Sequence, residues 1–464
     1  MFTAPLQIQS AQIAISEIFL GIVIILIIIL LGSSKKAKML KTPGNEHYKY
    51  YMYNIYFKIF FALIFGSIYV YYYNGGDTIA YWDGAAKMNN LLWKSPANYW
   101  RELIDAPDIY TIHKHYHSGT GYPPGWIYRD PNSFYISKII SVFMIFLGQS
   151  YLVLTLVFAY ISAIASWKLF EIVRYYRITS DSYAALSCLF IPSVAFWCTG
   201  LSKDTVVLIA VLFLLHLLFG LANKTITRKK LAFIYIFFLG FILYSTRTFM
   251  LFTVIAPMIL AIGTRILKKY RENIMLVNFF RIIIISVTIG GFLLFISWQG
   301  DKISETTTKY LTEAAVQQND FLNNELYGDK KYDLGVTDYS PTGMLSAAPM
   351  AIFTAIYRPA LWEARSPLLI ISGLETALFM YLTLVFIFKG SVLKKINFIR
   401  MNEFLVFSIT FAVMLAFFAG FTSILFGVLV RIKAPLLPFI LIILTTKSES
   451  IDLFKQKLGN ESDN

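Results

Sequence analysis

The feature that most constrains this chain is a series of long apolar runs, most of them bounded by clusters of Lys and Arg. Hydrophobic residues make up 57% of the sequence and charged residues 15%, whereas an ordinary soluble domain is about one quarter charged. Runs of roughly 18 or more apolar residues have the length of a transmembrane helix. Because the runs are continuous, without apolar and polar alternation, they predict helices rather than barrel strands. The expected fold is an all-α, polytopic transmembrane helix bundle.

The basic clusters also predict a topology, because Lys and Arg concentrate in cytoplasmic loops. Lys35–Lys41 follows the first run, which places that loop in the cytoplasm and the N-terminus outside. The later basic loops alternate consistently with this start and place a cytoplasmic tail at residues 447–464. We expect one integral membrane domain over residues 1–464, with about eleven spans: Glu17–Leu31, Tyr56–Tyr73, Tyr151–Ile172, Tyr183–Thr199, Thr205–Leu221, Leu231–Tyr244, Phe249–Ile262, Ile282–Trp298, Leu368–Phe388, Phe404–Phe421 and Pro435–Leu444.

Four further segments have particular expectations. Met1–Ser16 has no basic n-region, so the first apolar run is expected to be an uncleaved span rather than a signal peptide. Phe134–Gly148 is apolar but short and is expected to be a re-entrant or interfacial helix. Leu345–Leu361 is amphipathic and is expected to lie along the outer interface, whereas Thr422–Lys433 is expected to be irregular.

The net charge of +14 raises the question of a nucleic-acid partner. The basic residues fall between the spans and form no basic face apart from them, so we expect membrane lipids as partners and no nucleic acid. The two cysteines, Cys188 and Cys198, lie inside an apolar run and have the spacing of neither an exposed disulfide nor a metal motif.

Two long polar segments are expected on the outer face, at about residues 74–133 and 299–366. The first opens with Gly75-Gly76-Asp77 directly after a span and continues through Trp82 and Asp83. A carboxylate at this position suits a general base or a metal ligand. Asp77 equally suits the N-cap of a helix over Ile79–Leu92, and the two roles are compatible. We assign Asp77 as the candidate base and Asp83 as its helper.

The same segment contains a histidine tract, His113, His115 and His117. On a strand, alternate residues face the same way, so the three imidazoles would converge on one ion. The alternative is a His-rich surface loop, and we assign no metal ligand. The cofactor is left open, with a divalent cation as one alternative.

Basic residues on or near the outer side are the candidates for binding an anionic substrate. Arg247, Arg358 and Arg431 have the planar guanidinium that suits phosphate recognition, and Lys203 lies at a tight turn beside Asp204. The alternatives are snorkelling of the arginines to lipid headgroups, pairing with Glu363, and a helix-capping role for Asp204. Glu375 is a substrate-binding candidate because an intramembrane carboxylate is costly, and Trp82 because sugars stack on aromatic rings.

Three segments together resemble polytopic proteins from bacterial surface-polysaccharide clusters, particularly those of the Bacteroidetes. They are Phe190–Asp204, which contains Pro-Ser-Val-Ala-Phe-Trp, Tyr357–Glu375, which contains Tyr-Arg-Pro-Ala-Leu-Trp-Glu, and Phe421–Phe439. The placement of Asp77 resembles that of the outer-loop acid in the GT-C glycosyltransferases, which use polyprenyl-phosphate sugar donors. The outer arginines resemble those with which O-antigen polymerases hold a pyrophosphate-linked glycan.

The resemblance implies a protein of the bacterial inner membrane that transfers sugar at the outer face from a polyprenyl-linked donor. Asp77 would be the base, and Arg247, Arg358 and Arg431 would hold the diphosphate. The resemblance also implies envelope-assembly proteins as partners. Two other classes stay open: a transporter or flippase of a lipid-linked glycan, which needs polar residues along a path through the membrane, and a non-catalytic membrane scaffold.

Overall fold

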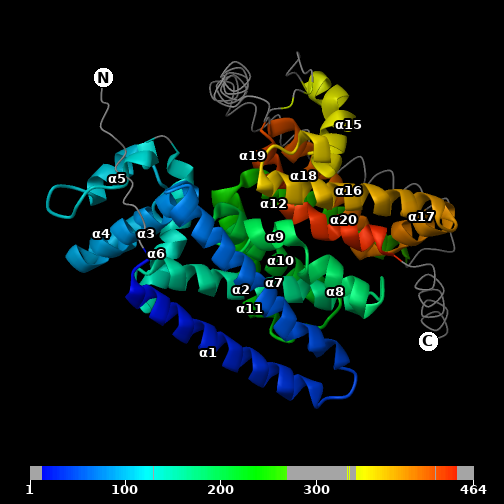
Figure 1. Cartoon of the computed structure of the whole chain (residues 1–464), viewed down its shortest axis with the longest axis horizontal. Helices are drawn as coiled ribbons and strands as arrows, with labels where there is room; N and C mark the ends of the chain where they lie inside the picture. Colours follow the sequence, from blue (N-terminus) through cyan, green and yellow to red (C-terminus); the bar gives the residue numbers. More distant parts are fainter. Residues whose placement is uncertain are drawn as a thin grey trace. The chain divides into compact units, whose positions relative to one another are not determined.

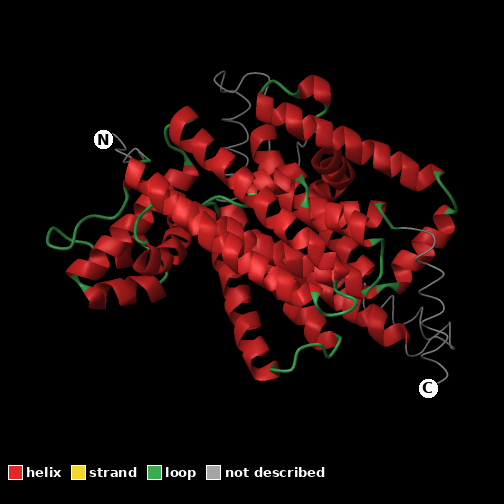
Figure 2. Cartoon of the chain, turned by 60° about the horizontal axis from the view of Figure 1, so that its bottom comes forward, coloured by secondary structure: helices red, strands yellow, loops and turns green. Residues whose placement is uncertain are grey.

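A computed structural model describes residues 13–128, 130–268, 332, 334, 341–423 and 425–446. Every regular element in these ranges is a helix (Figure 2). The all-α class expected from the sequence is therefore confirmed.

Nine helices in the described ranges are long and apolar enough to cross a membrane. Each of them corresponds to one of the eleven expected spans. The expected span Ile282–Trp298, residues 299–331 of the second polar segment and the tail at 447–464 lie outside the described residues. The nine are Ile15–Leu40 (α1), Glu46–Tyr72 (η1, α2 and η2), Tyr151–Tyr175 (α7), Lys203–Ala222 (α10), Lys229–Thr246 (α11), Thr248–Lys268 (α12), Pro367–Phe388 (α16), Glu403–Thr422 (α18) and Phe426–Leu444 (α19, η7 and α20) (Figure 1).

The prediction of one continuous span over Tyr183–Thr199 is wrong. The chain instead forms two short helices, α8 (Asp181–Leu189) and α9 (Pro192–Trp197). The break falls at Ile191, whose backbone is extended with φ −90° and ψ 117°. Proline disfavours the helical conformation in the residue before it and has no N–H to continue the helix. Pro192 therefore ends the first helix and begins the second.

The expected irregular segment Thr422–Lys433 is also largely wrong. Helix α19 (Phe426–Lys433) continues through η7 (Ala434–Leu436) into α20 (Leu437–Leu444). Pro435 and Pro438 each lie in the first turn of their helix, where a missing N–H is tolerated. The two prolines therefore delimit short helices without ending the apolar run.

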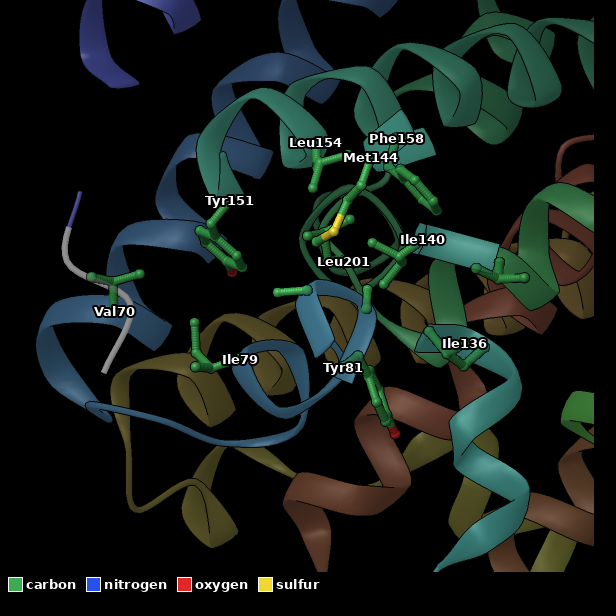
Figure 3. Packing of buried hydrophobic residues seen from close by; sticks show 13 residues of the cluster. Val70, Ile79, Tyr81, Ile136, Ile140, Met144, Tyr151, Leu154, Phe158 and Leu201 are labelled. Carbon is green, nitrogen blue, oxygen red and sulfur yellow. The ribbon is translucent and has the colours of Figure 1, made fainter. Parts of the chain in front are cut away.

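The chain divides into two compact units. Unit 1 contains Met1–Ile172 and Leu189–Thr248, and unit 2 contains Val173–Cys188 and Phe249–Asn464. In unit 1, α3 (Asp77–Lys94) packs against α6 (Phe134–Leu147). Figure 3 shows the apolar cluster around this contact, to which η2 (Ile68–Tyr72), α7 and the start of α10 also contribute, with Ile79, Tyr81, Ile136, Tyr151 and Leu201 among its members.

The polar segment after the second span folds into helices rather than a loop. It contains α3, α4 (Pro96–Ile104) and α5 (Ile109–His115), followed by the turns η3 (Gly125–Tyr128) and η4 (Pro131–Ser133). A second apolar cluster holds these elements together, built from Met88, Leu91, Tyr99, Ile112, Tyr116, Ile127 and Phe134. The following helix α6 is apolar and shorter than a span, as its sequence predicts.

A buried charged pair links α4 to α6. Glu102 on α4 and Lys138 on α6 are 0% and 2% exposed, and Nζ of Lys138 lies 2.9 Å from Oε1 of Glu102. Nζ also donates to the carbonyl oxygens of Glu102 and Asp105. Burial raises the pKa of the Glu102 carboxyl, and the charge of Lys138 opposes that shift. The pair ties α4 to α6.

Unit 2 is organised around α18. Helix α15 (Pro341–Tyr357) packs along α18 at a site where Gly420 lies against the backbone of Ala351. On another face, Phe407 and Phe411 of α18 contact Phe439 of α20, with ring centroids 5.9 and 4.7 Å apart. Small residues thus permit close helix approach on one side of α18, and aromatic rings fill the space on the other.

Candidate functional site

Asp77 is exposed at the first position of α3. The expected helix over Ile79–Leu92 is confirmed, but the N-cap is Gly76 rather than Asp77. The backbone reaches this point through positive φ angles at Asn74, Gly75 and Gly76, of 47°, 154° and 93°, which glycine adopts without a steric penalty. The preceding helix α2 (Lys49–Ser67) ends in a π-helical turn, Ile68–Tyr72. The carboxylate is therefore presented just beyond the end of a candidate span.

The other two candidates on α3 have internal partners. Asp83 is 3% exposed, and its Oδ2 lies 3.0 Å from Nζ of Lys87, one turn along the helix. The indole N–H of Trp82 donates to the carbonyl of Gln149, 2.7 Å away. The Trp82 contact therefore ties α3 to the segment before α7, whereas the Asp83 contact lies within α3. Of the two aspartates, Asp77 is the exposed one.

Two of the predicted basic residues have polar partners within unit 1: Arg247 contacts Asp204, and Lys203 contacts Ser133 of η4. Nη2 of Arg247 lies 2.5 Å from Oδ1 of Asp204, and Asp204 is 2% exposed. Nζ of Lys203 donates to Oγ of Ser133 at 3.3 Å, and Ser133 in turn donates to Asp130 at 2.5 Å. The prediction that Asp204 is the N-cap of α10 is wrong. The N-cap is Ser202, whose Oγ accepts a hydrogen bond from the N–H of Thr205. Asp204 instead orients the guanidinium of Arg247.

Unit 2 contains a second polar cluster, around Arg358. The Arg358 guanidinium forms a bidentate pair with Glu363, and the backbone N–H of Ala360 donates to Oε2 of the same carboxylate at 2.8 Å. The guanidinium carbon also lies 5.3 and 5.2 Å from the ring centroids of Tyr332 and Phe426. Arg358 is therefore fixed by a carboxylate and two aromatic rings.

Helix α19 and helix α16 add further charges to this cluster. Nζ of Lys433 donates to the carbonyl of Arg358 at 2.6 Å, and Lys433 is 1% exposed. Glu375 on α16 is close enough to interact with the charge of Lys433. Arg431 lies on α19 and is partly exposed. The structure thus brings Arg358 and Glu375 to a common neighbour, Lys433.

The Arg358–Glu363 pair predicts a pH dependence of stability. Burial raises the pKa of the Glu363 carboxyl, but hydrogen bonds from Arg358 and Ala360 outweigh it and leave the pKa below its usual value of 4.5. A carboxyl with a depressed folded-state pKa contributes stability above its unfolded pKa and loses it as the pH falls. We expect wild type to unfold at a higher temperature than Glu363→Gln at pH ~6, and this advantage to shrink below pH ~4.5. An advantage that does not change with pH would contradict the prediction.

The histidine tract does not form the strand on which the three imidazoles would converge. His113 and His115 lie on helix α5, so alternate residues do not share a face. Nε2 of His115 is 2.9 Å from Oδ2 of Asp105, His113 lies beside Tyr128, and Nδ1 of His117 accepts from the N–H of Gly119. Across the described part of the chain, no group of three or more His, Cys, Asp or Glu could hold a metal ion.

Three charged residues that are at most 2% exposed were not predicted as important: Lys58, Glu102 and Lys138. Lys58 and Lys138 both interrupt strongly apolar runs, Tyr56–Tyr73 and Phe134–Gly148. A charged residue inside such an apolar run often has a function or a buried partner. This signal in the sequence could have identified Lys58 and Lys138. Glu102 lies in an ordinary polar stretch, so nothing in the sequence distinguishes it from exposed acids.

The fold defines a multi-pass membrane protein. The nine apolar helices include α1 and α11, of which only 17% of the most apolar stretch is buried by the rest of the protein. Large apolar side chains exposed along such helices require a lipid environment. Comparison with protein-family models, with curated proteins and with solved structures gives no match.

Proposed function

We propose that this membrane protein is a glycosyltransferase or polysaccharide polymerase that uses a polyprenyl-phosphate-linked sugar donor. The observation that carries the proposal is the exposed Asp77 carboxylate, held at the first position of α3 directly after a candidate span. A polyprenyl chain keeps the reacting sugar close to the membrane surface. A base for such a donor must therefore lie at the end of a span rather than far from the membrane.

In the proposed reaction, Asp77 accepts the proton of an acceptor hydroxyl as the oxygen attacks the anomeric carbon. The bond from that carbon to the donor phosphate breaks, and negative charge develops on the departing phosphate. Cations near the leaving group would stabilise this charge. Arg247 and Lys203, which lie in the same unit as Asp77, supply them in this scheme.

The ion pair with Asp204 is compatible with this role for Arg247. A guanidinium has five N–H donors in a fixed plane, and the 2.5 Å contact with Asp204 uses Nη2. A carboxylate on one edge orients the plane, so another edge can address a phosphate. Arg358, Arg431 and Glu375 belong to unit 2, and we propose that they form a separate binding site for an anionic, lipid-linked substrate.

The proposed location is the bacterial inner membrane, with the N-terminus outside, the C-terminus in the cytoplasm and the reaction on the outer face. Its support is the alternation of Lys- and Arg-rich loops along the sequence and the resemblance to proteins of surface-polysaccharide clusters. Polyprenyl-linked sugars and envelope-assembly proteins are the partners that this location implies.

A second candidate function is movement of a lipid-linked glycan across the membrane. One observation favours it: Lys58 and Lys433, each 1% exposed, lie within candidate spans. Buried charges inside spans mark substrate pathways in many transporters. Sugar transfer needs no such residues, whereas transport of an anionic lipid headgroup does.

The test compares Asp77→Asn with Asp108→Asn in a deletion strain of the source organism. Asp108 is the matched control because it is also an exposed aspartate at the start of a helix, α5, in the same outer segment. We expect Asp77→Asn to reduce surface glycan at least about 100-fold, as loss of a general base does, while Asp108→Asn leaves it normal. Surface-glycan length is read on a gel, with the amount of protein in the membrane measured in parallel.

The fate of the lipid-linked intermediate separates the two functions. A block in transfer leaves lipid-linked units on the outer face, where a lectin reaches them in right-side-out vesicles. A block in transport leaves them on the inner face, where the lectin reaches them only after the vesicles are opened. Normal glycan in the Asp77→Asn strain would refute the catalytic role of Asp77.

A further inference from the structure

Lys58 lies near the middle of a candidate span and is almost completely buried. It is on α2, within the span Glu46–Tyr72, and 1% of its surface is exposed. The sequence around it, Tyr56-Phe-Lys-Ile-Phe-Phe, is apolar. A lysine at this depth cannot place its amine at the membrane surface without leaving the helix bundle.

The ion pairs of unit 1 do not include Lys58. Among the described residues of this unit, the paired cations are Lys87, Lys138, Lys168, Arg247 and the His115 ring. Cys198 is the one titratable group in the described residues that is close enough to Lys58 to interact with its charge. Glu171 acts instead on Tyr51, two turns earlier along α2. A charge at Lys58 is therefore not balanced by a carboxylate of the described chain.

The surroundings of Lys58 are polar and incompletely hydrogen-bonded. One turn before it, Nδ2 of Asn54 donates to the carbonyl of Ala163 on α7 at 2.8 Å, while Oδ1 of Asn54 is buried without a hydrogen-bond partner. Oγ of Ser166, one turn further along α7, is also buried without a partner. Ser162 on the same face donates to the carbonyl of Cys198 at 2.7 Å. The Asn54 and Ser162 hydrogen bonds thus join α7 to α2 and to Cys198, directly after α9, and Ser166 lies on α7 one turn beyond Ala163.

Buried polar atoms without partners indicate bound water or a bound ion, because leaving such atoms unsatisfied is costly. A buried ammonium is more costly still and needs either a counter-ion or water. The Ser166 hydroxyl and the Lys58 amine are hydrogen-bond donors, and Asn54 Oδ1 accepts from water or from the amine. Together they can hold an anion and the water around it.

We propose that Lys58, with Asn54, Ser166 and the segment at Cys198, forms a water-filled anion-binding site inside the membrane part of unit 1. The ligand class is a small anion or the anionic group of a larger molecule, such as a phosphate, sulfonate or carboxylate. This site is distinct from Asp77, and the inference does not depend on the glycosyl transfer proposed above.

Cys198 provides a probe for the site. It is 0% exposed, and Cys188→Ser leaves it as the one cysteine of the 464-residue chain. The full-length protein, in vesicles, is treated with methanethiosulfonates that carry an anionic sulfonate, a cationic trimethylammonium or no charge. Each rate at Cys198 is divided by the rate of the same reagent with a free thiol. The rate of the uncharged reagent reports the accessibility and reactivity of the Cys198 thiol. The ratio of the normalised rates of the anionic and cationic reagents reports the electrostatic potential at Cys198.

We expect the anionic reagent to react at least about tenfold faster than the cationic one, because an uncompensated positive charge in a low-dielectric site concentrates anions. Lys58→Met should abolish this preference, and Lys58→Arg should retain it within about threefold, since Arg keeps the charge. Elution as a single species in detergent establishes that each variant is folded. If Cys198 reacts only after unfolding, or if Lys58→Met leaves the preference unchanged, the site is not a water-filled anion site.

Discussion

Replacement of Lys138 by Met is expected to destabilise the folded protein by about 3–5 kcal/mol, because it leaves the Glu102 carboxylate buried without its ion-pair partner. Glu102 is 0% exposed and Lys138 is 2% exposed, so water cannot replace the lost ammonium at little cost. The same substitution removes two hydrogen bonds to backbone carbonyls at the end of α4. The expected consequence is detachment of α4 and α5 from α6.

The measurement is the thermal unfolding temperature of the purified full-length protein in detergent. The double variant Lys138→Met with Glu102→Leu removes both charges and should recover most of the loss, since an apolar pair of similar volume often replaces a buried ion pair without penalty. If the double variant is as unstable as Lys138→Met, the loss comes from packing or from the backbone carbonyls rather than from the unpaired carboxylate.

The loss in Lys138→Met should also depend on pH. Burial already raises the pKa of Glu102, and Lys138 opposes that rise, so removing Lys138 raises the pKa further. When folding raises the pKa of an acid, the protonated acid stabilises the folded state at low pH. This contribution is lost as the pH rises through the folded-state pKa. Lys138→Met should therefore be less destabilised at pH ~5 than at pH ~8. The double variant, which lacks Glu102, should not show this difference.

Replacement of Gly420 by Ala should separate α15 from α18. A Cβ at position 420 would overlap the carbonyl group of Ala351, and backbone atoms cannot rotate away as a side chain does. Overpacking of this kind usually costs about 1–3 kcal/mol and occasionally more, and we expect the upper part of that range. The carbonyl of Gly420 also accepts a hydrogen bond from Tyr332 at 3.1 Å, which a shift of α18 would disturb.

Gly427→Ala is the matched control for this prediction. Gly427 lies in helix α19 of the same unit, and a Cβ there would meet nothing within 4 Å. Ala is the better helix former of the two residues, so this variant should be as stable as wild type or slightly more so. Equal unfolding temperatures for the two variants would mean that α15 and α18 do not approach as closely as the structure has them.

The spans could be predicted because a membrane helix is specified locally. An apolar run of sufficient length buries its own backbone hydrogen bonds and needs no partner to cross the membrane. Where prediction failed, proline was the reason in both cases. All three prolines lie at helix starts. Pro192 interrupts an apolar run that has the composition of one span, whereas Pro435 and Pro438 leave a nearly continuous helical run. Composition alone does not distinguish these positions.

The candidate site could be predicted less completely. The exposure of Asp77 follows from its place after a span and two glycines, which is a local property. The pairing of Arg247 with Asp204 and of Glu102 with Lys138 depends on which helix ends meet. The pairing of Arg358 with Glu363, five residues along the chain, is local, and the sequence indicated it as an alternative. Asp83 illustrates the limit, since we assigned it as a helper of Asp77, whereas its side chain is 5% exposed and paired with Lys87.

Patterns along the sequence were enough to predict that the protein is helical, that it belongs in a membrane, and roughly where most of its long helices begin and end. Hydrophobic run length, glycine and the clustering of Lys and Arg act over a few residues, so they can be read without a fold. Which charges neutralise one another, and which, like Lys58, have no counter-charge among the described residues, follows only from the contacts between helices. The reason is physical: the free energy of a charge inside a membrane protein depends on groups a few ångströms away in space, and those groups are contributed by helices distant in the sequence.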